Sequence, residues 1–197
     1  MPQSLARRRV VRPPRSAAPS EGATRCTVSL PLQRAQLPPV PSTLLIPLAA
    51  RAHGGRYFPW LDCRDAVAPA LLARLDADVN GTLDDLHTVL HVLWRTRAIQ
   101  EAGRAFFAEH PQALGVNLGC GLTHYFQWLD GGANQWLDAD LPEVMALRRP
   151  LLPPPCPRTR HADLDLSQPG WWQRLGLPTQ HSATPVLLVC ELSLIHI

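Results

Sequence analysis

The sequence predicts an α/β fold with a doubly wound parallel sheet. Three observations predict it: short apolar runs typical of buried strands, segments of helical periodicity between these runs, and a glycine turn directly after the first run. Successive parallel strands need a helix that crosses back over the sheet, with a right-handed connection. Strands are expected at 114–118, 135–139, 159–162 and 185–190, and helices between them at 123–129, 141–151 and 171–175.

The chain ahead of the first strand is expected to form helices. A short helix is expected over 43–51 if Pro47 lies in its first turn, where a proline needs no amide, and a second over 66–75. The longest helix is expected to begin near Thr82, because Thr82 and the acids after it suit a positive helix N-terminus. Its apolar residues recur every three or four positions, as one buried stripe requires. They are Leu86, Val89, Leu90, Leu93, Ile99, Ala102, Phe106 and Phe107.

The domain organisation follows from these patterns. Residues 1–41 are rich in Pro and Arg and are expected to be a disordered leader. Residues 42–112 are expected to form a helical cover, and 113–191 the first half of a larger sheet domain. Residues 192–197 match the translation of a transposon end used in sequencing libraries, so we expect a non-native tail there and a natural chain that continues beyond Glu191.

Composition narrows the functional classes. The 197 residues carry a net charge of +3 and nineteen basic residues, all arginine, which are gathered in the leader or scattered among acids. This distribution argues against a nucleic-acid partner. No apolar run reaches the length needed to span a membrane, so no membrane association is expected. The five cysteines are odd in number and widely spaced, which predicts free thiols and a cytoplasmic location.

A glycine turn carries the strongest functional signal. Gly119 and Gly121 follow the first expected strand, and the acids Asp138 and Asp140 end the second, about 20 residues later. Bare glycines let a ligand approach the backbone, and an acid at that distance can bind ribose hydroxyls. The third position of the dinucleotide fingerprint holds His124 instead of a small residue, which disfavours NAD or FAD. An NAD-binding or other nucleotide-binding module is the alternative.

The chain resembles a known family over about 43–191: the class I S-adenosylmethionine-dependent methyltransferases of the leucine carboxyl methyltransferase and polyketide O-methyltransferase type. The resemblance is carried by 116–122, by 136–144 with its Asp-Leu-Pro-Glu-Val, and by Leu-Arg-Arg at 147–149. It implies a Rossmann-like methyltransferase sheet of which this chain holds about four of seven strands. It also implies S-adenosylmethionine as cofactor, and methyl transfer to a carboxylate or hydroxyl oxygen of a small molecule. A second alternative is that the chain as written is an inactive fragment.

The resemblance also assigns cofactor-binding roles. It implies that Arg95, with Arg97 as fallback, pairs with the cofactor's carboxylate, and that Gly119 and Gly121 line its methionine part. It further implies that Asp140 binds the ribose hydroxyls, with Asp138 as competitor.

The remaining assignments lie in the second half of the expected sheet. Asp163 and Leu164 match the family's adenine-side motif, although Asp165 leaves the register open, and Glu191 matches a family glutamate. After the glycine turn the family shows Leu-Asp-Thr-Arg where this chain has Leu-Thr-His-Tyr at 122–125. No catalytic base is assignable, and no oligomeric state is predicted.

Two further groups of residues are expected to be structural. His87 and His91 lie four residues apart on one expected helix but have no third ligand in the sequence nearby, so no metal site is expected. Cys120 lies inside the glycine turn, where we expect a small residue that packs and not a nucleophile.

Overall fold

The computed structural model describes residues 25–26, 42–77, 79–179 and 182–191. The predicted leader, apart from Arg25 and Cys26, and the predicted non-native tail at 192–197 lie outside the described residues.

Four parallel strands form one sheet in the order β3-β2-β1-β4. Strands β2 and β4 pair with β1, and β3 pairs with the other edge of β2; all three pairs are parallel. This topology confirms the predicted α/β fold. The strands are β1 Leu114–Leu118, β2 Gln135–Asp140, β3 Thr159–Asp163 and β4 Val186–Cys190, each within one residue of its predicted bounds.

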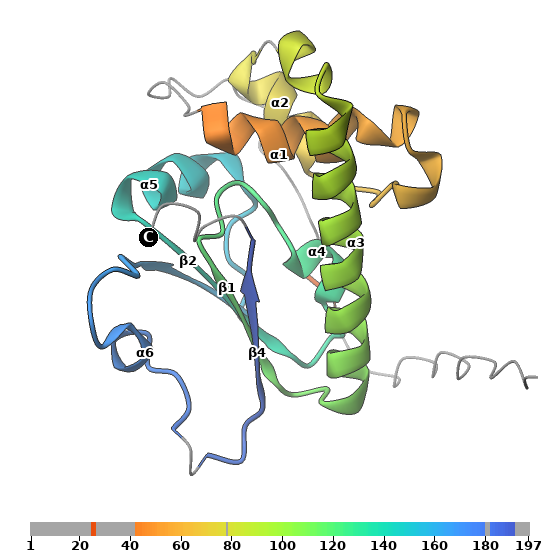
Figure 1. Ribbon diagram of the computed structural model, residues 1–197. Coiled ribbons are helices and arrows are strands. Elements are labelled where there is room, and N and C mark those ends of the chain that lie inside the picture. Colours follow the sequence, from red (N-terminus) through yellow and green to blue (C-terminus); the bar gives the residue numbers. More distant parts are fainter. Residues whose placement is uncertain (1–24, 27–41, 78, 180–181, 192–197) are drawn as a thin grey trace, which may run out of the picture.

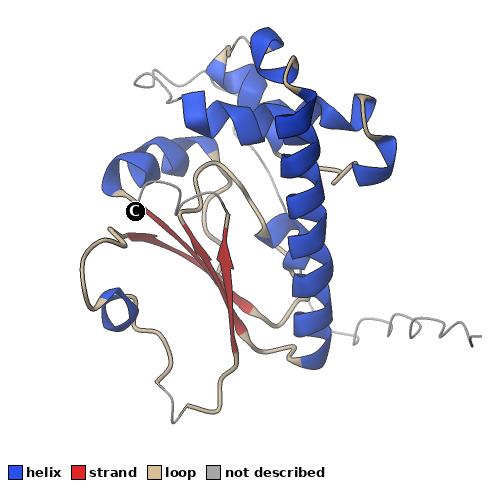
Figure 2. Ribbon diagram, in the orientation of Figure 1, coloured by secondary structure: helices blue, strands red, loops and turns tan. Residues whose placement is uncertain are grey.

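Six α-helices and three 3₁₀ helices surround the sheet in the described part of the chain. Figure 2 shows the long helix α3 running along one side of the sheet. The helices are α1 Ser42–His53, α2 Ala68–Leu75, α3 Leu86–Glu109, α4 Phe126–Leu129, α5 Pro142–Leu151 and α6 Trp171–Arg174, with η1 Gly54–Arg56, η2 Pro59–Leu61 and η3 Asn80–Leu83.

Two helix predictions were wrong in detail. The long helix begins at Leu86 and not near Thr82, because Asp85 caps it by accepting bonds from the amides of His87 and Thr88. Thr82 lies in η3 instead. Pro47 lies inside α1 and not in its first turn. Packing of α1 against α2 and α3 stabilises the helix although Pro47 cannot donate an amide bond.

The hydrophobic core packs the N-terminal helices against the carboxyl ends of the strands. In Figure 1, α1 and α2 lie beyond these ends and α5 lies beside them. One buried cluster joins α1, α2 and α5 to the turn after β1; it includes Leu48, Leu71, Leu122, Leu147 and Leu151. A second cluster fills the space between α3, α4 and the sheet and contains Phe107, Phe126 and Trp136. The N-terminal helices therefore cover the carboxyl ends of the strands.

Gly115 in β1 makes room for an aromatic ring. A Cβ atom here would overlap Cε3 and Cζ3 of Trp136 and lie 3.0 Å from Cζ of Phe107. Because Trp136 is fully buried, the ring has little freedom to move. We expect Gly115→Ala to lower the free energy of unfolding by about 1–3 kcal/mol, as overpacking does. Urea unfolding followed by tryptophan fluorescence measures it.

Gly81 is the matched control for this prediction, because a Cβ atom there has no neighbour within 4 Å. Gly81→Ala should change the free energy of unfolding by less than about 0.5 kcal/mol. Equal midpoints for the two variants would contradict the prediction.

A disulfide joins Cys26 to the loop before β3. Its partner is Cys156, with a Cα–Cα distance of 6.3 Å. The amide of Cys26 also donates to Asp130 at 2.8 Å, and Arg158 donates to both carboxylate oxygens of Asp130 at 2.7 and 2.8 Å. The prediction that these two cysteines are free thiols was therefore wrong. Pairing depends on which segments meet in space, and the two cysteines lie 130 residues apart in sequence.

No helix among the described residues is long and apolar enough to cross a membrane.

Candidate functional site

A cavity of about 700 Å³ lies beyond the carboxyl ends of the strands. Its walls come from α1, α3, the turn after β1, the end of β2, the first turn of α5, the segment after β3 and Glu191. In open α/β sheets ligands bind where the strand order reverses, which here is between β1 and β4. The cavity therefore occupies the position typical of a ligand site in this class of fold.

Backbone forms the wall nearest β1. Gly119 and Gly121 both line the cavity and have φ angles of +61° and +49°, which residues other than glycine rarely adopt. A Cβ atom on Gly121 would also lie 3.1 Å from Cδ2 of Leu44 in α1. The structure thus brings both predicted glycines to the cavity, in a conformation that requires them.

Asp140 ends β2 and lines the cavity beside the glycine turn. Its two carboxylate oxygens accept bonds from the amides of Gly121 and Leu141, each at 2.7 Å. Burial raises the pKa of Asp140 above its usual value, and the two amide bonds oppose that rise. Each carboxylate oxygen can accept a further bond, so the group can take a pair of ligand hydroxyls.

Asp138, the competing candidate for the ribose, does not line the cavity. Its carboxylate is 2 % exposed and accepts bonds from Arg148 at 2.7 Å, Trp136 at 3.0 Å and Asn117 at 3.1 Å. Burial alone would raise the pKa of Asp138, but Arg148 and the other donors outweigh it and lower that pKa. Donors from the protein therefore occupy the carboxylate oxygens of Asp138 that ribose hydroxyls would need. The alternative prediction, that Asp138 binds the ribose, is corrected.

The segment after β3 brings one of its two predicted residues to the cavity. Leu164 lines the cavity as expected, and its amide donates to the carbonyl of Asp140 at 2.7 Å. Asp163 does not line it; its side chain is 45 % exposed and pairs with Arg149. Asp165 does line it and accepts bonds from Ser167. The structure thus selects Asp165, the register that the sequence left open, over Asp163.

Arg95 and Glu191 meet at the end of the cavity formed by α3. Nε of Arg95 donates to Oε1 of Glu191 at 3.1 Å, and the hydroxyl of Tyr125 donates to Oε2 at 2.6 Å. Both Arg95 and Glu191 line the cavity. Nη2 of Arg95 is buried and has no hydrogen-bond partner among the described residues. One buried donor of Arg95 therefore remains available to a ligand.

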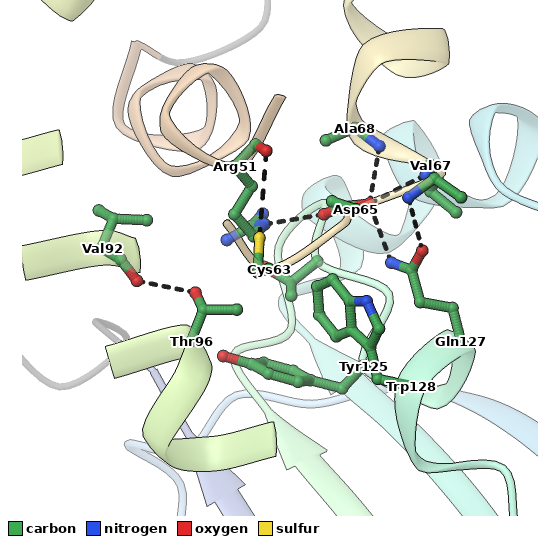
Figure 3. A network of polar contacts seen from close by, with 12 residues as sticks. Arg51, Cys63, Asp65, Val67, Ala68, Val92, Thr96, Tyr125, Gln127 and Trp128 are labelled. Carbon is green, nitrogen blue, oxygen red and sulfur yellow. Dashed lines mark hydrogen bonds and ion pairs between the residues drawn. The ribbon is translucent and has the colours of Figure 1, made fainter. Parts of the chain in front are cut away.

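Arg51 is a site residue that the sequence analysis missed. It lies in α1, lines the cavity, and its Nη1 lies 3.9 Å from Oε2 of Glu191 without a hydrogen-bond partner in the described structure. Figure 3 shows Arg51 donating to Asp65, which accepts the amides of Val67 and Ala68 at the start of α2. A lone arginine within the apolar sequence of α1 was the signal available in the sequence.

His124 follows the glycine turn and carries a buried Nδ1 without a partner among the described residues. Burial lowers the pKa of His124 from 6.5 to about 4. Between these values the unfolded chain takes up a proton and the folded chain does not. We therefore expect the free energy of unfolding to fall by about 3 kcal/mol through this group as the pH drops from 6.5 to 4. Denaturant titrations across this range measure it.

The comparison for His124 is a variant without a titrating group. His124→Gln should flatten the pH dependence in this window, whereas His87→Gln, at an exposed position of α3, should leave it as in the wild type. A wild-type profile that is already flat between pH 6.5 and 4 would contradict the expectation.

From the sequence, Cys120 and the two histidines of α3 are expected to be structural. Sγ of Cys120 is buried 3.7 Å from Sδ of Met145, and burial raises the pKa of this thiol, which agrees with a packing role. The described residues contain no group of three or more His, Cys, Asp or Glu side chains that could hold a metal ion. His91 lies on the wall of the cavity and His87 does not.

Comparison with known proteins finds similarity to a polyketide O-methyltransferase. No family model matches the chain. The tetracenomycin polyketide synthesis O-methyltransferase TcmP of Streptomyces glaucescens is 36% identical over 115 residues, which are 58% of this chain and 42% of TcmP. The match confirms the resemblance to polyketide O-methyltransferases that the sequence motifs indicate. The chain spans less than half the length of this relative.

Proposed function

Since the chain is a relative of the polyketide O-methyltransferases, we propose that its cavity binds S-adenosylmethionine and that the protein transfers the methyl group to an oxygen of a small molecule. The observation that carries the proposal is the glycine turn with Asp140 beside it. Bare backbone and a carboxylate with free acceptor capacity face the same cavity. The glycine turn and Asp140 together suit a nucleoside whose attached amino-acid part passes close to the protein backbone.

Each wall of the cavity fits one part of this cofactor. Asp140 would accept the two ribose hydroxyls, with Gly119 and Gly121 beside the methionine part. Leu164 and Asp165 would contact the adenine, the first by packing and the second by accepting its amino hydrogens.

The carboxylate end would meet two guanidinium groups. Arg51 and Arg95 flank Glu191, and each carries a buried Nη atom with no hydrogen-bond partner in the described residues. A guanidinium matches a carboxylate because its fork can meet both oxygens. Glu191 lies between the two arginines and would accept the ammonium group of the methionine part. The cluster thus offers complementary charge to both ends of an amino acid.

The bound cofactor would supply an electrophilic methyl group on a sulfonium. The residues of this chain would hold that group in line with the acceptor oxygen, which is the main contribution such an enzyme makes. A carboxylate acceptor needs no general base, and a hydroxyl acceptor is helped by one. Apolar residues of α1 and α5, including Leu44, Ile46 and Val144, form part of the cavity wall and favour an acceptor with apolar surface.

Calorimetric titration of the 197-residue chain with S-adenosylhomocysteine and, separately, with NAD⁺ tests the proposal. We expect S-adenosylhomocysteine to bind at least about tenfold more tightly, and Arg95→Met to weaken it by about tenfold through loss of a charged hydrogen bond. Tighter binding of NAD⁺ would favour the nucleotide-binding alternative. No cooperative unfolding and no binding of either ligand would favour the inactive-fragment alternative.

A cytoplasmic location is part of the proposal, and the disulfide provides its test. Disulfides are rare in a reducing cytosol. In a cytoplasmic protein, alkylation in freshly lysed cells should find Cys26 and Cys156 as thiols, and oxidation after purification should form the bond. A bond already present in cells would contradict a cytoplasmic location.

A further inference from the structure

Arg148 is a buried guanidinium that contacts the glycine turn without lining the cavity. It lies in α5 and is fully buried. Its Nη1 donates to the carbonyls of Gly121 and Thr123, both at 2.8 Å, and its Nη2 donates to Asp138 at 2.7 Å. The Leu-Arg-Arg motif at 147–149 thus includes a residue whose three acceptors are two turn carbonyls and one strand carboxylate.

Arg148 and Asp140 both bond to the backbone of Gly121 in the turn. Asp140 accepts the amide of Gly121, and Arg148 donates to the carbonyl of the same residue. Gly119 and Gly121 have positive φ and no side chain to limit alternative conformations, while Cys120 between them packs against Met145. Its shape therefore depends on groups outside it, and Arg148 makes two of the bonds that define it.

The chemistry of arginine fits this task. A planar guanidinium presents several donors in fixed directions, and an ammonium group or an apolar side chain cannot meet all three acceptors at once. Stability alone does not account for the residue, because a buried ion pair contributes little net stability compared with apolar packing. The neighbouring Met145, Leu147 and Leu151 are buried and apolar, so an apolar pair in place of both Arg148 and Asp138 would match that environment.

We propose that Arg148 is a positioning residue that holds the backbone of the glycine turn in its ligand-binding conformation, and that Asp138 orients it. The inference rests on the proposed function in one respect only, because the ligand used to measure the effect on the turn is the methyl donor or its product. The carboxylate that the sequence offered as a ribose ligand thereby acts through Arg148 on the turn, and not directly on the ligand.

Affinity for S-adenosylhomocysteine tests the proposal in the full chain. We expect Arg148→Lys to weaken binding at least about tenfold, because two charged bonds to the turn are lost or lengthened. Arg149→Lys, at the exposed neighbouring position, is the matched control and should bind as the wild type does. Gly115→Ala controls for stability: it should lower the unfolding midpoint while leaving the affinity unchanged.

Hydrogen exchange of the ligand-free chain provides a readout without any cofactor. Amides of 119–123 should exchange about tenfold faster in Arg148→Lys than in Arg149→Lys, while amides of β2 remain protected. If Arg148→Lys does not fold, Asp138→Asn, which removes the charge and one acceptor oxygen of the orienting group, should show the same increase. Wild-type affinity together with unchanged exchange would overturn the proposal. A wild type that does not bind S-adenosylhomocysteine refutes the proposed function, and the exchange measurement then decides this inference alone.

Discussion

Asp140→Asn should weaken binding of S-adenosylhomocysteine by about 100- to 1,000-fold. An amide keeps the shape of the carboxylate but removes its charge and one of its two acceptor oxygens. Two hydrogen bonds from ribose hydroxyls to a carboxylate contribute about 1.5–3 kcal/mol each, so their weakening together produces an effect of about 3–4 kcal/mol. Calorimetry at constant salt measures the change directly.

The pH dependence of the same affinity checks the mechanism. Because burial raises the pKa of Asp140, the free carboxylate takes up a proton at a higher pH than an ordinary aspartate does. Ribose hydroxyls bind the charged form, so the affinity should be constant above the raised pKa and fall as the pH drops through it. Asp140→Asn should remove this dependence.

Glu143→Gln is the matched control for Asp140→Asn. Glu143 is an exposed acid in the first turn of α5, and its substitution changes the net charge by the same amount. It should change the affinity less than about threefold, as loss of an exposed charge does. Equal effects of the two variants would mean that Asp140 acts only through long-range charge and does not contact the ribose.

Cys156→Ser should lower the free energy of unfolding by about 4–5 kcal/mol under oxidising conditions, the largest change in stability expected for this chain. The disulfide closes a long loop, because its cysteines lie 130 positions apart in sequence, and the entropy that the cross-link removes from the unfolded chain grows with the logarithm of loop length. Removal of the bond returns that entropy to the unfolded state. Guanidinium unfolding of the wild type and the variant measures the difference.

Reduction is the control for Cys156→Ser. A reducing agent should bring the wild type to the stability of the variant and leave the variant unchanged, because the other thiols described, Cys63 and Cys120 among them, are not disulfide-bonded. If the wild type is equally stable with and without reducing agent, the cross-link does not constrain the unfolded chain.

The strands and the glycine turn could be predicted from the sequence because their signals are local. Leu114–Leu118 is a short apolar run bounded by turns, and burial on both faces of a parallel strand needs nothing else. Gly119 and Gly121 follow from the same logic, since a turn with positive φ excludes other residues. The helix starts were less accurate because Thr82 and Asp85 are both good caps, and tertiary contacts decide between them.

The rest of the site depends on choices of one or two residues that local patterns do not fix. Asp138 and Asp140 are close in sequence and both end β2, but one contacts Arg148 in the interior and the other contacts the turn. Asp163 and Asp165 are also two residues apart, but Asp163 is exposed and pairs with Arg149, whereas Asp165 lines the cavity. Only the path of the backbone determines which acid of each pair reaches the cavity.

The ion pair between Arg95 and Glu191 joins residues 96 positions apart, with the glycine turn between them in the chain. A molecule held by this pair and the turn can bind only when α3, β1 and the end of β4 are all in place. Its binding free energy is therefore added to the stability of the entire described fold, and the folded fraction should rise with its concentration. With the proposed methyl donor as this molecule, its supply in a cell would also affect how much of the protein survives proteolysis.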